Sequence, residues 1–239
     1  MTQPTLIRRE GISARPLLLD LFCCAGGAAT GYDRAGFDVV GVDIVERPNY
    51  PFTFVRAEAL EHVAGLIESG EIGRFAAVHS SPPCQAGCAL TVGTNKARGW
   101  GREHVQLIPE LRTLLDATGL PYVIEQPNGK APVRRDVWLC GEMFGLGVLR
   151  HRNFELGRWT MPQPAHPKHR GYVRVYRDGP YVAPYGAGGG KATVPEMQEA
   201  MGITWTDVRE ELTEAIPPAF SEHIGHALLT AVRPVEVAA

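Results

Sequence analysis

The feature that most constrains this sequence is a strand, a glycine-rich turn, a helix and a second strand within residues 16–44. An apolar run from Leu17 to Phe22 precedes a stretch of small residues and glycines, and a second apolar run covers residues 39–44. This order is a βαβ unit, which implies a parallel sheet. The alternation continues with strands expected at 75–79 and 122–125, and with helices near 58–68 and before Thr118. We therefore predict an α/β fold with a doubly wound, Rossmann-like sheet.

Composition excludes several other classes of protein. The 239 residues are 44% hydrophobic and 21% charged, which is typical of a globular protein with a sizeable core. We find no run approaching the roughly 20 apolar residues of a membrane span, and residues 1–15 are too polar for a signal peptide. The five cysteines are an odd number without the spacing of a disulfide scaffold. We expect free thiols in a reducing, cytoplasmic compartment, away from any membrane.

The amino-acid composition of the sequence changes after about residue 158. Residues 158–192 are rich in Pro, Gly and His and contain one alternating stretch at 172–176, which predicts a small irregular insert. The pattern from Thr193 to Glu196 predicts a capping box that opens a helix, and another helix is expected at 217–232. We predict a catalytic and cofactor-binding domain over 14–157, the insert over 158–192, and a return to the first domain over 193–233.

Charge is unevenly distributed along the chain. The net charge is −2, but residues 130–177 hold ten Lys and Arg against three acids, a local balance of +7 that leaves −9 for the rest. Such a segment is either a solvated mixed surface or a face that contacts phosphates. The loop from 90 to 102 adds glycines and three cations, so it is either a lid for an anionic substrate or a solvated loop. Its cations are Lys96, Arg98 and Arg102.

Three positions at strand ends carry the candidate chemistry. The glycine-rich turn with Asp43 at the end of the second strand suits a nucleotide-like ligand, and it fits NAD, FAD or S-adenosylmethionine equally well, or a purely structural turn. Cys84 follows a buried strand and two stiffening prolines, so it is either an inert thiol or a nucleophile. Glu125 ends an apolar strand and is either ion-paired or an acid/base group. No second Cys or His pair was found to complete a metal site with Cys84 and Cys88, so we expect no metal.

Taken together in chain order, these residues resemble the DNA (cytosine-5) methyltransferase family. The resemblance covers about two-thirds of the chain. It comprises Asp20-Leu21-Phe22 with Gly26, Gly27 and Gly31, then Gly41-Val42-Asp43, Pro82-Pro83-Cys84-Gln85, Ile124-Glu125-Gln126, Arg150-His151-Arg152, Ala215-Ile216-Pro217-Pro218 and Ile224-Gly225.

The resemblance implies an S-adenosylmethionine-dependent methyltransferase fold, with the insert as a small target-recognition region, and methylation at C5 of a cytosine flipped out of double-stranded DNA. Cys84 would add to C6, Glu125 would hold or protonate N3, and Arg150 and Arg152 would contact the cytosine carbonyl and phosphates. The implied cofactor residues are Phe22, Gly26, Gly27, Asp43, Glu58, Pro82 and Pro217. The implied DNA contacts are Gln85, Lys96, Arg98, Arg102, Arg174 and Arg177.

Three residues depart from the family pattern. Cys24 replaces the first glycine of the cofactor turn, Gln126 replaces an Asn, and Glu214 replaces another Asn. If position 24 needs a positive φ, a cysteine there costs about 1–2 kcal/mol. Glu214 would disfavour a carboxylated cofactor analogue. The alternatives are an RNA cytosine methyltransferase, a non-catalytic DNA-binding relative, and a nicotinamide or flavin oxidoreductase, which would leave the Pro-Pro-Cys-Gln segment unexplained.

Overall fold

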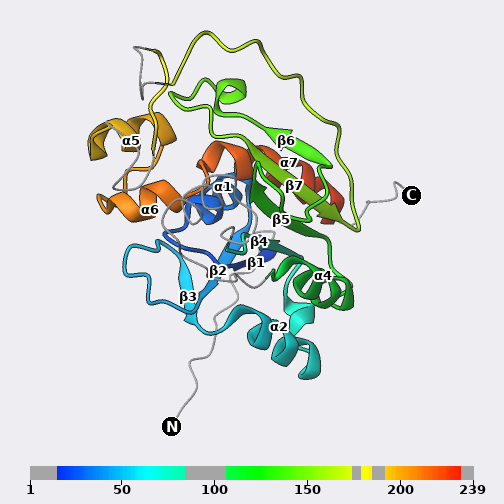
Figure 1. The fold of residues 1–239 in the computed structure, drawn as a ribbon. Coiled ribbons are helices and arrows are strands. Elements are labelled where there is room, and N and C mark those ends of the chain that lie inside the picture. Colours follow the sequence, from blue (N-terminus) through cyan, green and yellow to red (C-terminus); the bar gives the residue numbers. More distant parts are fainter. Residues whose placement is uncertain (1–14, 84–105, 174–178, 185–191, 233–239) are drawn as a thin grey trace.

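A computed structural model describes residues 15–83, 106–173, 179–184 and 192–232 (Figure 1). They build one seven-stranded sheet in the order β3-β2-β1-β4-β5-β7-β6. The strands are β1 (Leu17–Leu21), β2 (Asp38–Asp43), β3 (Thr53–Arg56), β4 (Ala77–Ser80), β5 (Tyr122–Pro127), β6 (Val137–Leu139) and β7 (Arg152–Gly157). The first five pair in parallel with one another, whereas β7 runs antiparallel to both β5 and β6. The predicted α/β class is confirmed.

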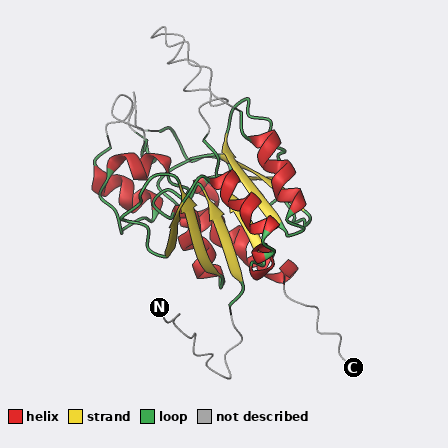
Figure 2. Ribbon diagram, turned by 90° about the horizontal axis from the view of Figure 1, so that it is seen from below, coloured by secondary structure: helices red, strands yellow, loops and turns green. Residues whose placement is uncertain are grey.

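Helices cover both faces of the sheet (Figure 2). They are α1 (Gly27–Ala35), α2 (Ala59–Glu68), α4 (Ile108–Ala117), α5 (Val194–Met201), α6 (Arg209–Glu214) and α7 (Pro218–Val232), with short 3-10 turns η1 (Glu71–Arg74) and η2 (Gly141–Phe144). Alternate residues of β1 separate two cores, because successive side chains of a strand point to opposite faces. Leu18 packs with α1 and α7, while Leu19 and Leu21 pack with α2 and α4.

Helix α7, drawn in red in Figure 1, lies directly against α1, which is drawn in blue. The close approach depends on Gly31, where an added Cβ would lie 2.1 Å from Ser221 Oγ and 2.2 Å from the Pro218 carbonyl oxygen. The helix expected at 217–232 is therefore present as α7 and packs on the first βαβ unit. Helices α5 and α6 share a third small core with Val148 and Val182. The predicted capping box is confirmed, because Thr193 and Glu196 cap α5 reciprocally.

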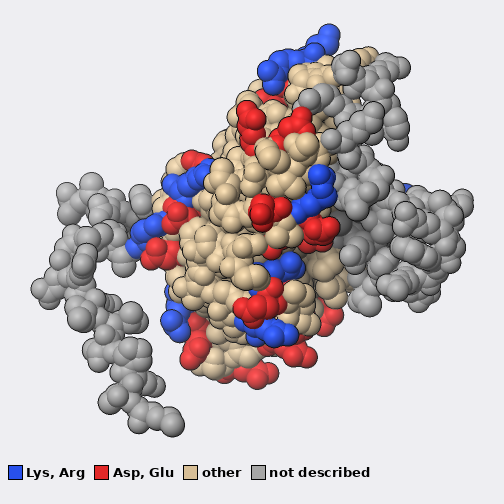
Figure 3. All heavy atoms as spheres, turned by 90° about the vertical axis from the view of Figure 1, so that its left-hand side faces the viewer, with Lys and Arg blue, Asp and Glu red and all other residues tan. Residues whose placement is uncertain are grey.

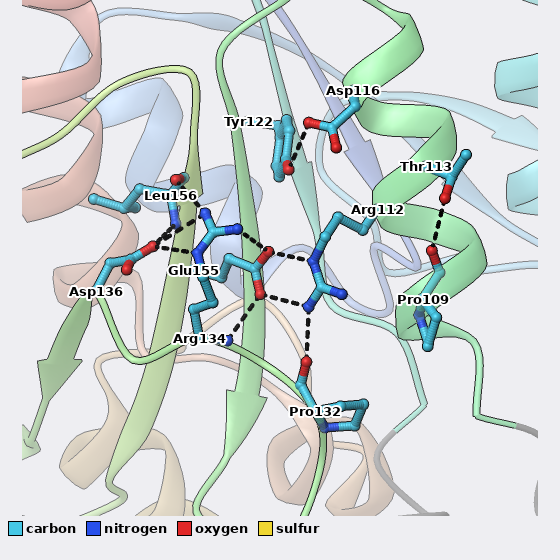
Figure 4. Close-up of polar contacts among 10 residues, drawn as sticks. All are labelled: Pro109, Arg112, Thr113, Asp116, Tyr122, Pro132, Arg134, Asp136, Glu155 and Leu156. Carbon is cyan, nitrogen blue, oxygen red and sulfur yellow. Dashed lines mark hydrogen bonds and ion pairs between the residues drawn. The ribbon is translucent and has the colours of Figure 1, made fainter.

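Strand β7 was not predicted, and its charged residues explain why. Glu155 has no solvent exposure, yet it is held by Arg112 of α4, whose Nε and Nη2 lie 2.6 and 2.8 Å from its two oxygens (Figure 4). Arg134 Nη1 adds a third contact at 3.0 Å. Burial alone would raise the pKa of Glu155, but the hydrogen bonds from Arg112 and Arg134 hold it below its usual value. The strand is buried because partners distant in sequence neutralise its charge.

Basic and acidic side chains are interspersed on the face of the molecule seen in Figure 3, without a broad basic area among the coloured residues.

In the part of the chain that the structure describes, no helix is long and apolar enough to cross a membrane.

Candidate active site

A pocket of about 520 Å3 lies beyond the carboxyl ends of β1, β2, β4 and β5. Open α/β sheets bind their ligands in this position, because the strand order reverses there and leaves a crevice. The residues that line it come from every strand-end segment that the sequence singled out. They are Asp20, Phe22, Cys23, Cys24, Gly27, Ala28, Asp43, Ile44, Val45, Arg47, Glu58, Ser81, Pro82, Pro83, Leu107, Glu125, Pro127, Arg152, Thr213, Glu214, Ala215 and Ile216.

The turn after β1 forms one wall of the pocket in a left-handed backbone conformation. Phe22 has φ 57° and Cys24 has φ 46°, both unusual for residues with a side chain. Position 24 therefore has the positive φ at which a cysteine costs about 1–2 kcal/mol. Gly27 lines the pocket, and a Cβ there would lie 2.3 Å from the Ile216 carbonyl oxygen. Gly26 is outside the lining and packs against Tyr50.

Asp43 is fixed by donors on both of its oxygens. The backbone amides of Cys24 and Val45 donate to it at 3.1 and 3.0 Å, and Arg47 Nε lies 3.1 Å away in an ion pair. Glu58 caps α2 by accepting from the Glu61 amide at 2.8 Å. Both predicted acids therefore face the pocket with their carboxylates held in place by the backbone.

Asp20 lines the same pocket and was not proposed as a site residue. It has no solvent exposure, and neither of its oxygens has a hydrogen-bond partner among the described residues. Burial and, secondarily, the charge of Asp43 raise its pKa well above the usual value. The signal in the sequence is an acid inside the run Leu17-Leu18-Leu19-Asp20-Leu21, which is costly to bury without a partner. Arg47 was missed as well, since it lies beyond the strand-end position.

Glu125 and Arg152 form a buried ion pair at the opposite side of the site. Arg152 Nε lies 2.7 Å from Glu125 Oε1, and the two side chains are 14% and 6% exposed. Burial raises the pKa of Glu125, while Arg152 and then Arg150 oppose that shift. The neighbouring Gln126 donates to the Pro82 carbonyl at 2.6 Å, which ties β5 to the loop that leads toward residue 84. Two of the predicted catalytic residues are thus in direct contact.

Whereas Arg152 is paired with a carboxylate, Arg150 contacts backbone carbonyls. Its Nε and Nη2 donate to the carbonyls of Ala215 and Thr213 at 2.9 and 2.5 Å, so it anchors the segment that closes the pocket. Arg150 itself is absent from the lining of the pocket. Pro217, predicted to help close the pocket, is buried and also absent from the lining, whereas the two residues before it are present.

Two of the departures from the family pattern touch each other. Cys24 Sγ lies 3.6 Å from Glu214 Oε2, across 190 positions of sequence. Burial raises the pKa of Cys24 to about 12, an effect that Arg47 opposes and Glu214 adds to. The thiol therefore keeps its proton and donates to the carboxylate.

Fewer basic side chains of the segment 130–177 are available to contact another molecule than its net charge suggests. Five of its described arginines are engaged with acids or carbonyls of the same chain: Arg134 with Glu155, Arg152 with Glu125, Arg170 with Glu142, Arg135 with the Gly129 carbonyl, and Arg150 with the two carbonyls named above. The predicted nucleophile and DNA contacts lie outside the described residues: Cys84, Gln85, Lys96, Arg98, Arg102, Arg174 and Arg177.

Solved structures of methyltransferases are among those similar to this chain. A DNMT2 mutant from Spodoptera frugiperda gives a TM-score of 0.59 at 12% identity, covering 90% of this chain and 99% of that chain. The Entamoeba histolytica methyltransferase EhMeth gives 0.52 at 11% identity, covering 93% and 100%. A putative DNA modification methyltransferase from an E. coli prophage gives 0.44 at 18% identity over 59% of this chain, which spans 46% of that protein's length. No family model and no curated protein matches the sequence. The chain has the Rossmann-like α/β fold of methyltransferases.

Proposed function

We propose that this protein is an S-adenosylmethionine-dependent DNA methyltransferase that acts at C5 of cytosine. The observation that carries the proposal is the buried pair of Glu125 and Arg152 in one pocket with the strand-end acid Asp43. Pro82 and Pro83 line the same pocket and lead directly to Cys84 in the sequence. An acid group and a cofactor acid therefore lie at the ends of β5 and β2, and the segment after β4 leads in the sequence to the candidate nucleophile.

The charge of the pocket suits a cationic cofactor. Four carboxyl groups besides Glu125 line it, namely Asp20, Asp43, Glu58 and Glu214, against Arg47 at the same end. Asp20 in particular is buried without a partner among the described residues, and a positive group would satisfy it. When bound, S-adenosylmethionine supplies an electrophilic methyl group on a positively charged sulfur. Phe22 offers an apolar surface to the adenine, and Asp43 and Glu58 offer acceptors to ribose and base.

The chemistry assigned to the chain's own residues follows from the weak nucleophilicity of cytosine at C5. The Cys84 thiolate adds to C6 and forms a carbon–sulfur bond, which moves electron density toward C5. Glu125 donates a hydrogen bond or proton to N3, a role favoured by burial that raises its pKa. Arg152 orients that carboxyl from 2.7 Å. After the methyl group is in place, a base removes the C5 proton and the Cys84 sulfur leaves.

The substrate proposed is double-stranded DNA, from which the target cytosine must leave the base stack to reach the pocket. Mechanism-based trapping tests this directly. The full chain is incubated with S-adenosylmethionine and a GC-rich duplex containing 5-fluorocytosine, whose C5 fluorine cannot leave as a proton. We expect an adduct that survives denaturation.

Cys84→Ala should abolish the adduct. The matched control is Cys88→Ala, which removes a thiol four positions away in the sequence and should keep the adduct. Cofactor binding should persist in both variants. An adduct that persists in Cys84→Ala assigns the nucleophile to another residue. Trapping on RNA but not DNA would replace the proposed substrate with RNA, and no adduct on either, with cofactor binding intact, refutes the proposed reaction.

A further inference from the structure

A second cluster of reactive side chains lies apart from the pocket. Cys140 follows β6, His151 immediately precedes β7, and His166 and His169 belong to the segment after β7. Each offers one donor atom, and these four atoms all lie within 4.8 Å of one another. None of the four residues lines the candidate active site. Three separate segments thus converge on one point with one sulfur and three imidazole nitrogens.

The distances within the cluster fit a tetrahedral metal site. With a metal–nitrogen bond of about 2.0–2.1 Å and a metal–sulfur bond of about 2.3 Å, tetrahedral angles separate two nitrogens by about 3.3 Å and a nitrogen from sulfur by about 3.6 Å. His169 Nε2 lies 3.3 Å from His166 Nε2 and 3.6 Å from Cys140 Sγ. No two of the four donor atoms lie more than 4.8 Å apart.

Hydrogen bonding alone leaves this arrangement unsatisfied. One imidazole nitrogen carries either one N–H or one lone pair in the ring plane, so it forms one well-aligned hydrogen bond. His169 Nε2 nevertheless faces both Cys140 and His166. His151 Nε2 is buried and has no hydrogen-bond partner among the described residues. A cation at the centre would satisfy all of these atoms together.

Surrounding residues hold the donors in place. The Trp138 ring stacks on both His151 and His166, with ring centroids 4.8 and 4.4 Å apart. The Met143 backbone amide donates to the Cys140 side chain, a contact that fixes the position of the sulfur. Such outer contacts orient ligands in metal sites and conserve their geometry when the metal binds.

We propose that Cys140, His151, His166 and His169 bind one Zn2+ ion. One thiolate and three neutral imidazoles suit zinc, and four protein ligands leave no open position, so the site is structural. The ion would clamp the start of the insert onto β6 and β7. It would also fix His151, the neighbour of Arg152, which holds Glu125 in the active site.

This proposal departs from the expectation of no metal, which weighed only Cys84 and Cys88 as ligands. The pair His166 and His169, three positions apart, is the signal in the sequence that was passed over.

Metal analysis of the full chain, purified without a histidine tag or chelator, tests the site. We expect about one zinc per chain, because a closed four-ligand site binds tightly at neutral pH. Cys140→Ser and the double variant H166N/H169N should lose it. The matched control is His226→Asn, which changes an exposed histidine of α7 and should retain the zinc.

Cobalt substitution gives a second readout that does not depend on those variants folding. Co2+ in the wild-type chain should show the visible bands of a tetrahedral site and a near-ultraviolet thiolate band. Both should persist in the double variant C84A/C88A, because Cys140 supplies the sulfur. A chain that binds neither metal, zinc retained when Cys140, His166 and His169 are replaced, or a thiolate band lost with Cys84 and Cys88 would each overturn the proposal.

Discussion

Replacing Arg152 with Met tests the central ion pair of the site. The guanidinium Nε lies 2.7 Å from Glu125 Oε1, and both side chains are largely buried. Removing one partner of such a pair leaves a buried charge uncompensated, which costs about 3–5 kcal/mol of unfolding free energy. For a chain of this size that corresponds to a fall in the thermal midpoint of roughly 6–20 °C. Arg74→Met, at an exposed arginine, should change stability by less than about 0.5 kcal/mol.

The pH dependence identifies Glu125 as the source of that cost. Burial raises the folded-state pKa of Glu125 above 4.5, and Arg152 opposes the rise, so the pKa climbs further in Arg152→Met. Above pH 4.5 the folded state then holds a proton that the unfolded state has lost. The stability of Arg152→Met should therefore fall as pH rises from 4.5 through the folded-state pKa.

The double variant E125Q/R152M removes the titrating group and serves as the reference. Urea unfolding of both variants at about pH 5 and about pH 8 should give similar midpoints at the lower pH and a clear deficit for Arg152→Met at the higher one. Equal midpoints at both values would refute the reasoning, because Glu125 would then not be the uncompensated charge.

Three further changes test the fold. Gly31→Ala should lower the unfolding free energy by about 2–3 kcal/mol through overpacking against α7. Its control, Gly65→Ala, has open space around it in α2 and should raise the unfolding free energy by about 0.5–1 kcal/mol. Equal effects of the two variants in denaturant titrations would contradict the close contact between α1 and α7. Thr193→Ala should cost about 1 kcal/mol in the same assay by removing the cap of α5, and no loss would mean that the cap is dispensable. Glu155→Gln should cost about 1–3 kcal/mol by weakening its bond to Arg112. Because the pKa of Glu155 is lowered, wild-type stability should fall as pH drops below 4.5, and it should fall less in the variant.

The parallel half of the sheet could be predicted because its signals are local. Apolar strands, glycines and helix patterns alternate within about forty residues, and β1, β2, β4 and β5 lie close to where they were expected. Strand β7 escaped prediction because Arg152 and Glu155 look incompatible with burial. Their partners, Glu125 and Arg112, are 27 and 43 positions away, and only the folded chain brings them together.

The residues of the candidate site also divide into those that could be predicted from local sequence and those that could not. Asp43 and Glu125 could be placed from their position at strand ends, since parallel strands carry these residues to one edge of the sheet. Asp20 gives only a partial signal, because an acid inside an apolar strand is costly to bury but does not show whether a partner exists. The cluster of Cys140 with His151, His166 and His169 combines three segments, and no spacing rule joins them before the fold is known.

The departures from the family pattern at Cys24 and Glu214 are best understood as one unit. A cysteine with φ 46° is strained relative to glycine, so it persists only where its surroundings compensate. Its thiol keeps its proton and donates to Glu214 at 3.6 Å, a contact between two residues that line the pocket. Glycine at position 24 would release the strain and leave Glu214 without this contact. The acidity of the pocket toward a cofactor therefore depends on both residues together, and the effect of either cannot be inferred from the family pattern one position at a time.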